Sequence, residues 1–322
     1  MSTTCPNSPK QTFSLASDTG KKWRVGLMTM MLSLAAGLLI YSLSASAAEA
    51  QESAAKNLVP IHMNYKYGYI NAQAAMVIPP RFEGAREFAA NGLAAARENR
   101  KDGYINTKGE WVIHPKFEFA CDFDAKGLAC VKEDGKMGYI NAKGESLIPP
   151  KFDLAWSFSA NGLARIKENG KYGYINVFGE IVIPLKFDYA EDFSTNGLAM
   201  ILENKKFGYI NTKGEIVISP IFWWAQSFSV DGLAIAMENG KRGYINNKGE
   251  WVIPPMFDGS RDFSANGLSA AKENNKWGYI NLKGEWVIPP KFDNAWPFDA
   301  NNLAAVMENG KWGYSISNST MH

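Results

Sequence analysis

Carboxylates are the side chains whose spacing in this sequence could support acid–base chemistry. Five glutamates recur at intervals of 35 residues: Glu168, Glu203, Glu238, Glu273 and Glu308. Glycoside hydrolysis needs two carboxylates that converge on one bond. Each of these glutamates instead stands three residues before a lysine of the same period, as in Glu273 and Lys276. The pattern therefore predicts solvated cross-strand ion pairs, and it does not favour a catalytic pair.

Histidines and sequence motifs give no support for other catalytic chemistry. Three histidines, His62, His114 and His322, fall in unrelated sequence contexts, so a catalytic triad or a histidine metal site is hard to build. The sequence has no Walker loop, no dinucleotide-binding glycine pattern, no nucleophile elbow and no calcium loop. We therefore predict no enzyme activity, no cofactor and no metal. An enzyme that acts on glycans is the weaker alternative.

Two cysteines could form a covalent crosslink. Cys121 and Cys130 lie nine residues apart within one copy of a repeat, while Cys5 belongs to the N-terminal leader. An even pair of cysteines in an exported protein can form a disulfide. The alternative is two unrelated small residues, because Ala95, Arg165 and Met200 occupy the position of Cys130 in other copies.

These residues are carried by a repeat with a constant period. Gly-Tyr-Ile-Asn begins at seven glycines, and a degraded Gly-Tyr-Ser-Ile begins at an eighth, each 35 residues after the one before: Gly68, Gly103, Gly138, Gly173, Gly208, Gly243, Gly278 and Gly313. Such self-similarity indicates a repeat architecture in which neighbouring copies share a core. We expect a leader over residues 1–47, a linker over 48–56, the repeat domain over 57–317 and a tail over 318–322.

Each copy is expected to form three short β-strands. In the copy around Gly278 these are Leu268 to Glu273, Lys276 to Asn281 and Trp286 to Ile288. Asn-Gly or Asp-Gly dipeptides join the first two strands in several copies and favour a tight antiparallel hairpin. A second turn is expected at Lys-Gly-Glu, where a glycine such as Gly109 can take a left-handed conformation. Paired prolines are expected to end the third strand, because proline has no amide hydrogen to donate.

The predicted fold is therefore all-β, built from tandem three-stranded repeats. A solenoid-like stack is preferred, because a propeller blade normally has four strands and each copy has three. A seven-bladed β-propeller is the alternative.

The repeat resembles the bacterial WG-repeat (KWG) proteins. The resemblance rests on Lys276-Trp277-Gly278-Tyr279-Ile280-Asn281, on Lys311-Trp312-Gly313-Tyr314 and on the repeated Val-Ile-Pro-Pro-x-Phe-Asp, and it covers residues 66 to 314. It implies an all-β tandem-repeat protein of a commonly exported family, mostly without a defined biochemical role. The tryptophan that names the family is replaced in six of the eight copies, by Tyr67, Asp102, Met137, Tyr172, Phe207 and Arg242.

The N-terminal leader predicts export. Lys21, Lys22 and Arg24 precede an apolar stretch over residues 25–43, and small residues around Ala47 suit signal cleavage. If the leader is not cleaved, the stretch anchors the chain in the inner membrane. In either case the repeats are expected outside that membrane, in the periplasm or beyond the cell. The formal charge of +2 comes from the leader, so the repeats are nearly neutral and nucleic acid is disfavoured as a partner.

Positions that vary between copies are the candidates for binding. Lys, Gly and Tyr fill their positions in all eight copies and read as scaffold, whereas the position before the glycine varies widely and is therefore expected to be exposed. Aromatic residues at this and two other variable positions could form a contact surface, with packing between repeats as the alternative. The candidates are Tyr67, Tyr172, Phe207, Trp277, Trp312, Trp111, Trp251, Trp286, Trp156 and Trp296.

These observations favour an exported, noncatalytic repeat scaffold that interacts with protein or cell-envelope polysaccharide. A purely structural envelope protein without a discrete ligand is the second hypothesis.

Overall fold

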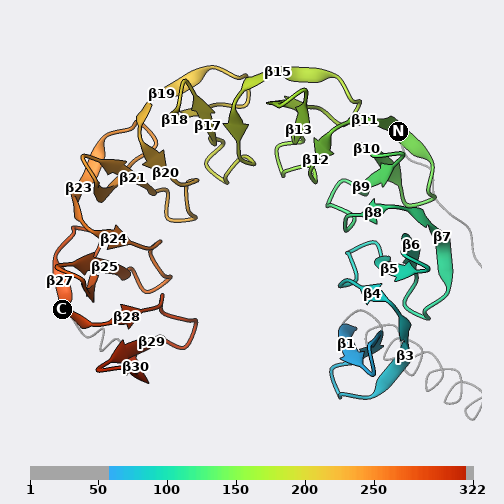
Figure 1. Cartoon of the computed structure of the whole chain (residues 1–322), viewed down its shortest axis with the longest axis horizontal. Coiled ribbons are helices and arrows are strands. Elements are labelled where there is room, and N and C mark those ends of the chain that lie inside the picture. The colour runs from blue at the N-terminus through green and yellow to red at the C-terminus, as the bar shows by residue number, and fades with distance from the viewer. Residues whose placement is uncertain (1–57, 317–322) are drawn as a thin grey trace, which may run out of the picture. The chain divides into compact units, whose positions relative to one another are not determined.

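The computed structural model describes residues 58–316, and this part of the chain is all-β (Figure 1). Thirty strands form eight small antiparallel sheets that follow one another in chain order. The first sheet contains β1 (Val59–Met63), β2 (Lys66–Ile70) and β3 (Met76–Phe82). No closed barrel forms among the described residues, because each sheet pairs only its own strands.

Each later sheet starts with a two-residue strand, which we call the lead strand. Lead strands are β4 (Gly84–Ala85), β8 (Phe119–Ala120), β12 (Leu154–Ala155), β16 (Tyr189–Ala190), β20 (Trp224–Ala225), β24 (Gly259–Ser260) and β28 (Asn294–Ala295). The first strands that follow them are β5 (Ala94–Glu98), β9 (Leu128–Glu133), β13 (Ala164–Glu168), β17 (Ala199–Glu203), β21 (Ala234–Glu238), β25 (Ser269–Glu273) and β29 (Leu303–Glu308).

Second and third strands complete the sheets. Second strands are β6 (Lys101–Ile105), β10 (Lys136–Asn141), β14 (Lys171–Ile175), β18 (Lys206–Ile210), β22 (Lys241–Ile245), β26 (Lys276–Ile280) and β30 (Lys311–Ile316). Third strands are β7 (Trp111–Phe117), β11 (Ser146–Phe152), β15 (Ile181–Phe187), β19 (Ile216–Phe222), β23 (Trp251–Phe257) and β27 (Trp286–Phe292). The last sheet has the order β28-β29-β30, with β30 at its edge.

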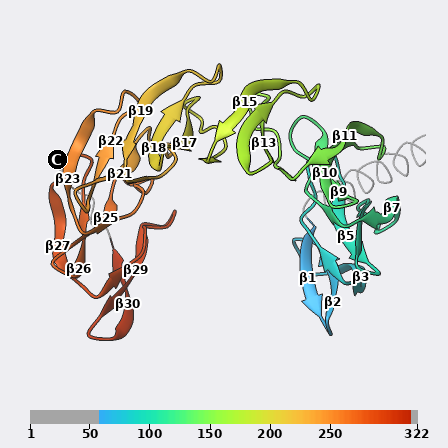
Figure 2. The ribbon, with the colours of Figure 1, turned by 45° about the horizontal axis from the view of Figure 1, so that its top comes forward.

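The lead strand corrects the prediction of three strands per repeat. The third strand of one sheet runs directly into the lead strand of the next, as β7 runs into β8. Figure 1 labels both of these strands, and Figure 2 shows the successive sheets from another direction. Six sheets therefore have four strands, which removes the argument from strand number for preferring a solenoid-like stack over a propeller.

Both predicted turns have the expected backbone. In the hairpin between β13 and β14, Asn169 and Gly170 have φ values of 50° and 80°, as a type I′ turn requires. In the second turn Gly109 has a φ of 83°, a conformation that favours glycine. The Asn of the repeated motif also stabilises this turn: Asn106 Oδ1 accepts the backbone N–H of Lys108 and of Glu110, each at 3.0 Å.

The paired prolines do not end the third strand, contrary to the prediction. Strand β27 continues through Pro289 and Pro290 to Phe292, which lies opposite Trp277 after a shift in register. The shift occurs where the backbone passes Gly278: a Cβ at Gly278 would lie 2.8 Å from Pro290 N. Glycine is needed at this position because the backbones approach closely. Proline fits opposite it because a bulge needs no ladder hydrogen bond there.

The repeated tyrosines join neighbouring sheets. Each tyrosine from Tyr69 to Tyr279 has at most 1% of its surface exposed, and its hydroxyl donates a hydrogen bond to a backbone carbonyl 17 residues later in the next sheet. For Tyr139 the acceptor is the carbonyl of Trp156, at 2.8 Å. The ring also packs on a phenylalanine between the lead strand and the first strand of the next sheet. Tyr139 packs on Phe158 in this way, with ring centroids 4.9 Å apart. Hydrophobic clusters therefore span consecutive sheets, which confirms a core shared between repeats.

The repeated lysines do not pair with the predicted glutamates. Lys276 Nζ lies 2.5 Å from Oδ1 of Asp293, which follows the third strand. Asp258, which pairs with Lys241, also accepts the backbone N–H of Asn274 in the next hairpin at 2.8 Å. The same arrangement of lysine and aspartate recurs elsewhere, in Lys136 with Asp153 and in Lys171 with Asp188. The aspartate is favoured because it can bond both the lysine and a neighbouring hairpin.

Cys121 and Cys130 form a disulfide in the third sheet, with their Cα atoms 5.2 Å apart. Cys121 follows β8 and Cys130 belongs to β9, and the backbone N–H of Cys121 donates to the carbonyl of Cys130 at 2.8 Å. The bond therefore joins two segments that are already neighbours.

The predicted leader, its apolar stretch over residues 25–43, the linker over 48–56 and the tail over 318–322 lie outside the described residues. Within residues 58–316, no helix has the length and apolar character needed to cross a membrane.

Candidate functional site

The predicted exposure of the variable aromatic positions is wrong in most copies. In the position before the repeated glycine, Tyr172 is buried with 8% of its surface exposed, and Asp102 and Met137 are buried as well. Only Trp312, in the last sheet, and Trp296 are exposed among the candidates, at 56% and 47%. The other candidates are half-buried: Tyr67, Phe207, Trp277, Trp111, Trp251, Trp286 and Trp156.

The residue type at a buried position can vary between copies when the side chain at a neighbouring position changes with it. Within each later sheet, the first residue of the lead strand and the residue before the repeated glycine flank one residue of the first strand. In the seventh sheet Gly259 leaves room that the Trp277 ring fills, with a ring carbon 3.3 Å from the position of a Cβ on Gly259. In the sixth sheet the Arg242 guanidinium stacks 4.3 Å from the Trp224 ring. In these two sheets, a large residue at one position accompanies a small or stacking residue at the other.

The remaining tryptophans have packing partners. Trp111, Trp251 and Trp286 make edge-on contacts with the last phenylalanine of the preceding third strand, as Trp111 does with Phe82 at 5.5 Å. Trp156 lies 4.1 Å from the guanidinium of the buried Arg165, and Trp296 lies 4.5 Å from the guanidinium of the half-buried Arg261. Their contacts favour a scaffold role for these rings, and ligand binding by them stays a prediction.

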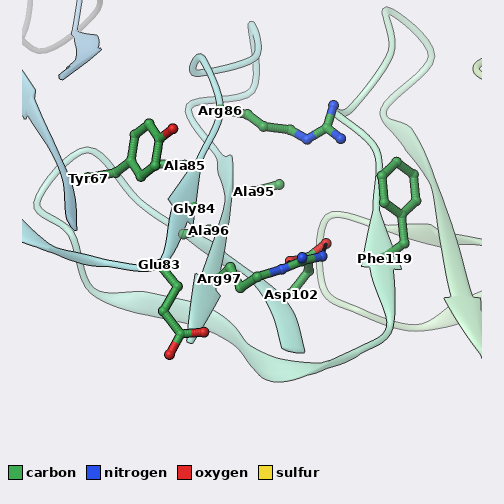
Figure 3. A pocket seen from close by; sticks show the side chains of 10 residues that line it. All are labelled: Tyr67, Glu83, Gly84, Ala85, Arg86, Ala95, Ala96, Arg97, Asp102 and Phe119. Carbon is green, nitrogen blue, oxygen red and sulfur yellow. Dashed lines mark hydrogen bonds and ion pairs between the residues drawn. The ribbon is translucent and has the colours of Figure 1, made fainter. Parts of the chain in front are cut away.

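In the second sheet neither of these two positions carries a large side chain, and a pocket opens there. Gly84 and Asp102 occupy these two positions on either side of Arg97, and all three residues line the pocket. The cavity has a volume of about 350 Å³. Figure 3 shows Tyr67 of the first sheet and Phe119 of the third sheet on opposite sides, with Gly84 between them.

The polar side chains of this Gly84 pocket are held by ion pairs and hydrogen bonds. Arg97 Nε donates to Asp102 Oδ1 at 2.6 Å, and Asp102 Oδ2 accepts the backbone N–H of Ala120 at 2.9 Å. The hydrogen bond to Asp102 raises the pKa of Arg97 above its usual value. Asp102 is therefore a buried, fully bonded carboxylate that fixes the Arg97 guanidinium in the pocket wall.

The rim carries one basic and one acidic side chain. The Arg86 guanidinium lies 5.1 Å from the Phe119 ring and 3.9 Å from Asp122, whose pKa is raised by burial. Glu83 accepts the backbone N–H of Arg100 at 2.9 Å, and this bond lowers the pKa of the Glu83 carboxyl. In Figure 3 the Arg86 and Glu83 side chains lie at opposite ends of the lead strand β4. The pocket therefore offers two aromatic rings and fixed hydrogen-bonding groups of both charge signs.

Sequence reasoning identified Tyr67 but missed the rest of this pocket. The signal was present as a pair of small residues, Gly84 and Asp102, in positions where the other copies place at least one large side chain. It could be read only after the lead strand was known, because that strand brings position 84 beside Arg97 and hence near position 102. Within residues 58–316, no cluster of histidine, cysteine or carboxylate side chains could hold a metal ion.

The fold and the pocket define a tandem-repeat β protein with a small surface site. The chain belongs to the WG containing repeat family, whose model matches residues 67–101, 103–136, 137–172, 172–207, 207–241, 243–277 and 277–312. This confirms the resemblance found in the sequence. No curated protein matches the sequence.

Solved structures show likeness at the level of the fold. A eukaryotic initiation factor is 13% identical, with a TM-score of 0.53 over 77% of each chain. The extracellular domain of a putative one-component system from B. thetaiotaomicron is 12% identical, with a TM-score of 0.35 over 74% of this chain and 41% of that one. Hsv2p of Kluyveromyces lactis is 9% identical, with a TM-score of 0.41 over 72% and 96%.

Proposed function

We propose that this chain is an exported, noncatalytic repeat scaffold that binds cell-envelope glycan through the Gly84 pocket. The observation that carries the proposal is the pair of small residues Gly84 and Asp102, which leaves a cavity of about 350 Å³ between two aromatic rings. A pocket with apolar walls and a few fixed polar groups is the usual form of a small-ligand site.

The chemistry of the pocket suits a sugar unit. A sugar ring has apolar C–H faces, which pack on aromatic rings, and an edge of hydroxyl groups, which need donors and acceptors. Tyr67 and Phe119 supply the rings. Arg97 and Arg86 supply planar donor groups, and the ion pair with Asp102 holds Arg97 in place before a ligand arrives.

The bonding of the two carboxylates in this pocket supports a binding role. A general acid or base must reach the substrate and exchange a proton with it. Asp102 is occupied by Arg97 and the Ala120 N–H, and Glu83 is occupied by the Arg100 N–H. Neither carboxylate has the free, convergent arrangement that glycoside hydrolysis needs.

Export is supported by the leader and by the cysteine pair. The basic residues, the apolar stretch over 25–43 and the small residues around Ala47 have the order of an export signal. A disulfide between Cys121 and Cys130 suits an oxidising compartment such as the periplasm.

Filling the pocket tests the proposal. Gly84 has no positive φ, and a Cβ there would meet only Arg97 Cβ at 3.4 Å, so Gly84→Leu should fold and place its side chain in the cavity. A leucine, Leu154, stands at the same position in the fourth sheet. We expect the purified protein to be retarded in gels that contain envelope polysaccharide, and Gly84→Leu to abolish the retardation. Phe178→Ala is the matched control, because Phe178 is 80% exposed and lies outside the pocket.

Three results would contradict the proposal. Absence of retardation by every polysaccharide in the panel would favour a purely structural role. Equal retardation of the native protein and Gly84→Leu would exclude the pocket as the binding site. Release of sugar from the polysaccharide by the purified protein would indicate an enzyme.

A further inference from the structure

Among residues 58–316, the last sheet has no third strand, whereas every preceding sheet has one. In the seventh sheet, β27 pairs with β26 and places Phe292 opposite Trp277 and Ile288 opposite Tyr279. In the last sheet, β30 is the edge strand, and none of the described residues pairs with its outer side. An edge of this kind presents backbone N–H and C=O groups that can pair with another strand.

The side chains of β30 are uncovered where their counterparts are buried. Tyr314 is 76% exposed, whereas the seven earlier tyrosines of the motif are at most 1% exposed. Trp312 and Ile316 are 56% and 64% exposed. Three large apolar side chains on one short edge strand mark an interaction surface.

A groove follows this edge. It has a volume of about 400 Å³ and is lined by Phe292, Val306, Trp312, Gly313 and Tyr314, with Lys291, Glu308 and Lys311 around it. In three earlier sheets the first residue of the third strand packs on the residue equivalent to Phe292, as Trp286 does on Phe257 at 5.6 Å. The groove therefore lies where a third strand would place its side chains.

Gly313 retains the space that a third strand needs. At Gly173 an added Cβ would lie 2.6 Å from the carbonyl oxygen of Ile183 in the paired strand, so glycine is required there. At Gly313 an added Cβ would meet nothing within 4 Å. The described fold of the last sheet thus gives no steric reason for this glycine, but an added strand would.

We propose that the open edge of β30 binds an extended segment of a partner protein, which pairs antiparallel in the position that the third strand takes in the earlier sheets. The seven earlier sheets show what such a segment must carry. It needs an isoleucine beside Tyr314 and, four residues later, a phenylalanine beside Trp312, as Ile288 and Phe292 provide in β27. Addition of a strand to a sheet edge is an established mode of peptide recognition.

Charge adds a third requirement. Lys276 in the seventh sheet pairs at 2.5 Å with Asp293, the residue after Phe292. Lys311 is the equivalent lysine at the edge of β30, so the segment should carry an acidic residue directly after its phenylalanine. The recognition pattern is therefore Ile-x-x-x-Phe-Asp, and it is independent of the Gly84 pocket and its ligand.

A peptide from the protein's own third strand tests the proposal directly. Residues 284–294, labelled with a fluorophore, would be titrated with the full chain, and fluorescence anisotropy would report binding. We expect saturable binding. A matched peptide with Ile288→Asp and Phe292→Asp should not bind, because both apolar contacts are lost.

Two variants of the full chain identify the binding edge. Gly313→Val should weaken peptide binding by about tenfold or more, since a branched side chain blocks the close backbone approach. Its far-UV circular dichroism should match the native protein, because a Cβ at 313 has no neighbour within 4 Å. Lys311→Glu should weaken binding less, through repulsion of the peptide's aspartate.

Absence of saturable binding would overturn the proposal, and so would equal binding of the two peptides. Equal binding of the native peptide to the native chain and to Gly313→Val would place the peptide elsewhere and also overturn it. Loss of glycan binding in Gly84→Leu with peptide binding retained would leave this proposal intact.

Discussion

The seventh and last sheets contain the same motif in opposite environments. Lys-Trp-Gly-Tyr begins at Lys276 in one and at Lys311 in the other. Tyr279 has none of its surface exposed and donates a hydrogen bond to the carbonyl of Trp296 at 2.8 Å, while Tyr314 is 76% exposed. The motif by itself therefore does not determine whether its tyrosine is buried. The next sheet supplies the acceptor and the cover for Tyr279. No described sheet follows Tyr314, and there the same residues are exposed.

Alkaline pH should produce the largest effect, because it acts on every covered tyrosine at once. Burial raises the pKa of Tyr244 and Tyr279 to about 12 and also raises that of the other five. A folded-state pKa above the unfolded value of about 10 means that this stability is complete below pH 10 and is lost as pH rises through the folded pKa.

We therefore expect cooperative unfolding between about pH 10 and pH 12. Far-UV circular dichroism and the phenolate absorbance should change together, because the covered hydroxyls ionise as the sheets separate. Ionisation of all the tyrosines near pH 10, with the sheet signal intact, would show that the covered tyrosines are not protected as the structure indicates.

Replacing the repeated tyrosine by alanine should lower the free energy of unfolding by several kcal/mol more in an interior sheet than in the last sheet. Tyr174 is fully buried, donates to the carbonyl of Glu191 at 2.5 Å and packs on Phe193. Tyr174→Ala should lower the free energy of unfolding by about 4 kcal/mol, from the cavity and the unpaired carbonyl. Tyr314→Ala should change it by less than about 1 kcal/mol, since an exposed side chain loses little packing. Urea unfolding of both variants measures the difference, and similar losses in the two would refute the contrast.

Replacing the repeated glycine by alanine, which adds one methyl group, should give a smaller difference in stability between interior and last sheets. Gly173→Ala places a Cβ 2.6 Å from Ile183 O and 2.9 Å from Leu185 N, so the third strand must shift. The expected loss is about 2 to 3 kcal/mol. Gly313→Ala should be neutral or slightly stabilising, because nothing lies within 4 Å and alanine reduces the entropy of the unfolded chain. A comparable loss in Gly313→Ala would show that β30 is already paired in solution.

The sequence predicted the local features of the fold well. Hairpin turns at Asn169-Gly170 and the left-handed glycine at Gly109 follow from residue preferences that act within a few bonds. The lead strand was missed because two residues carry too little pattern to be recognised as a strand. The extension of β27 through Pro289 and Pro290 was missed because the bulge opposite Gly278 accommodates residues without an amide hydrogen.

The candidate site was predicted less well, for a reason that Trp277 and Gly259 illustrate. Variation at one position was taken to indicate exposure, but a buried position can also vary when a neighbouring position changes with it. Trp277 covers Gly259 across the first strand, although the two are 18 residues apart in sequence. The Gly84 pocket forms where neither of the two neighbouring positions carries a large side chain. Only the strand pairing shows which two positions are neighbours.

The sequence by itself determined the 35-residue repeat, the three long strands of each copy, their turns and the need for neighbouring copies to share a core. These depend on local backbone preferences and on a period that is visible in the residues. Only the tertiary structure decided which rings are covered, that Asp293 and not Glu273 pairs with Lys276, and where the surface opens. A tyrosine of the motif is buried only where a neighbouring sheet covers it. The same Gly-Tyr is therefore part of the core at Tyr279 and exposed at Tyr314.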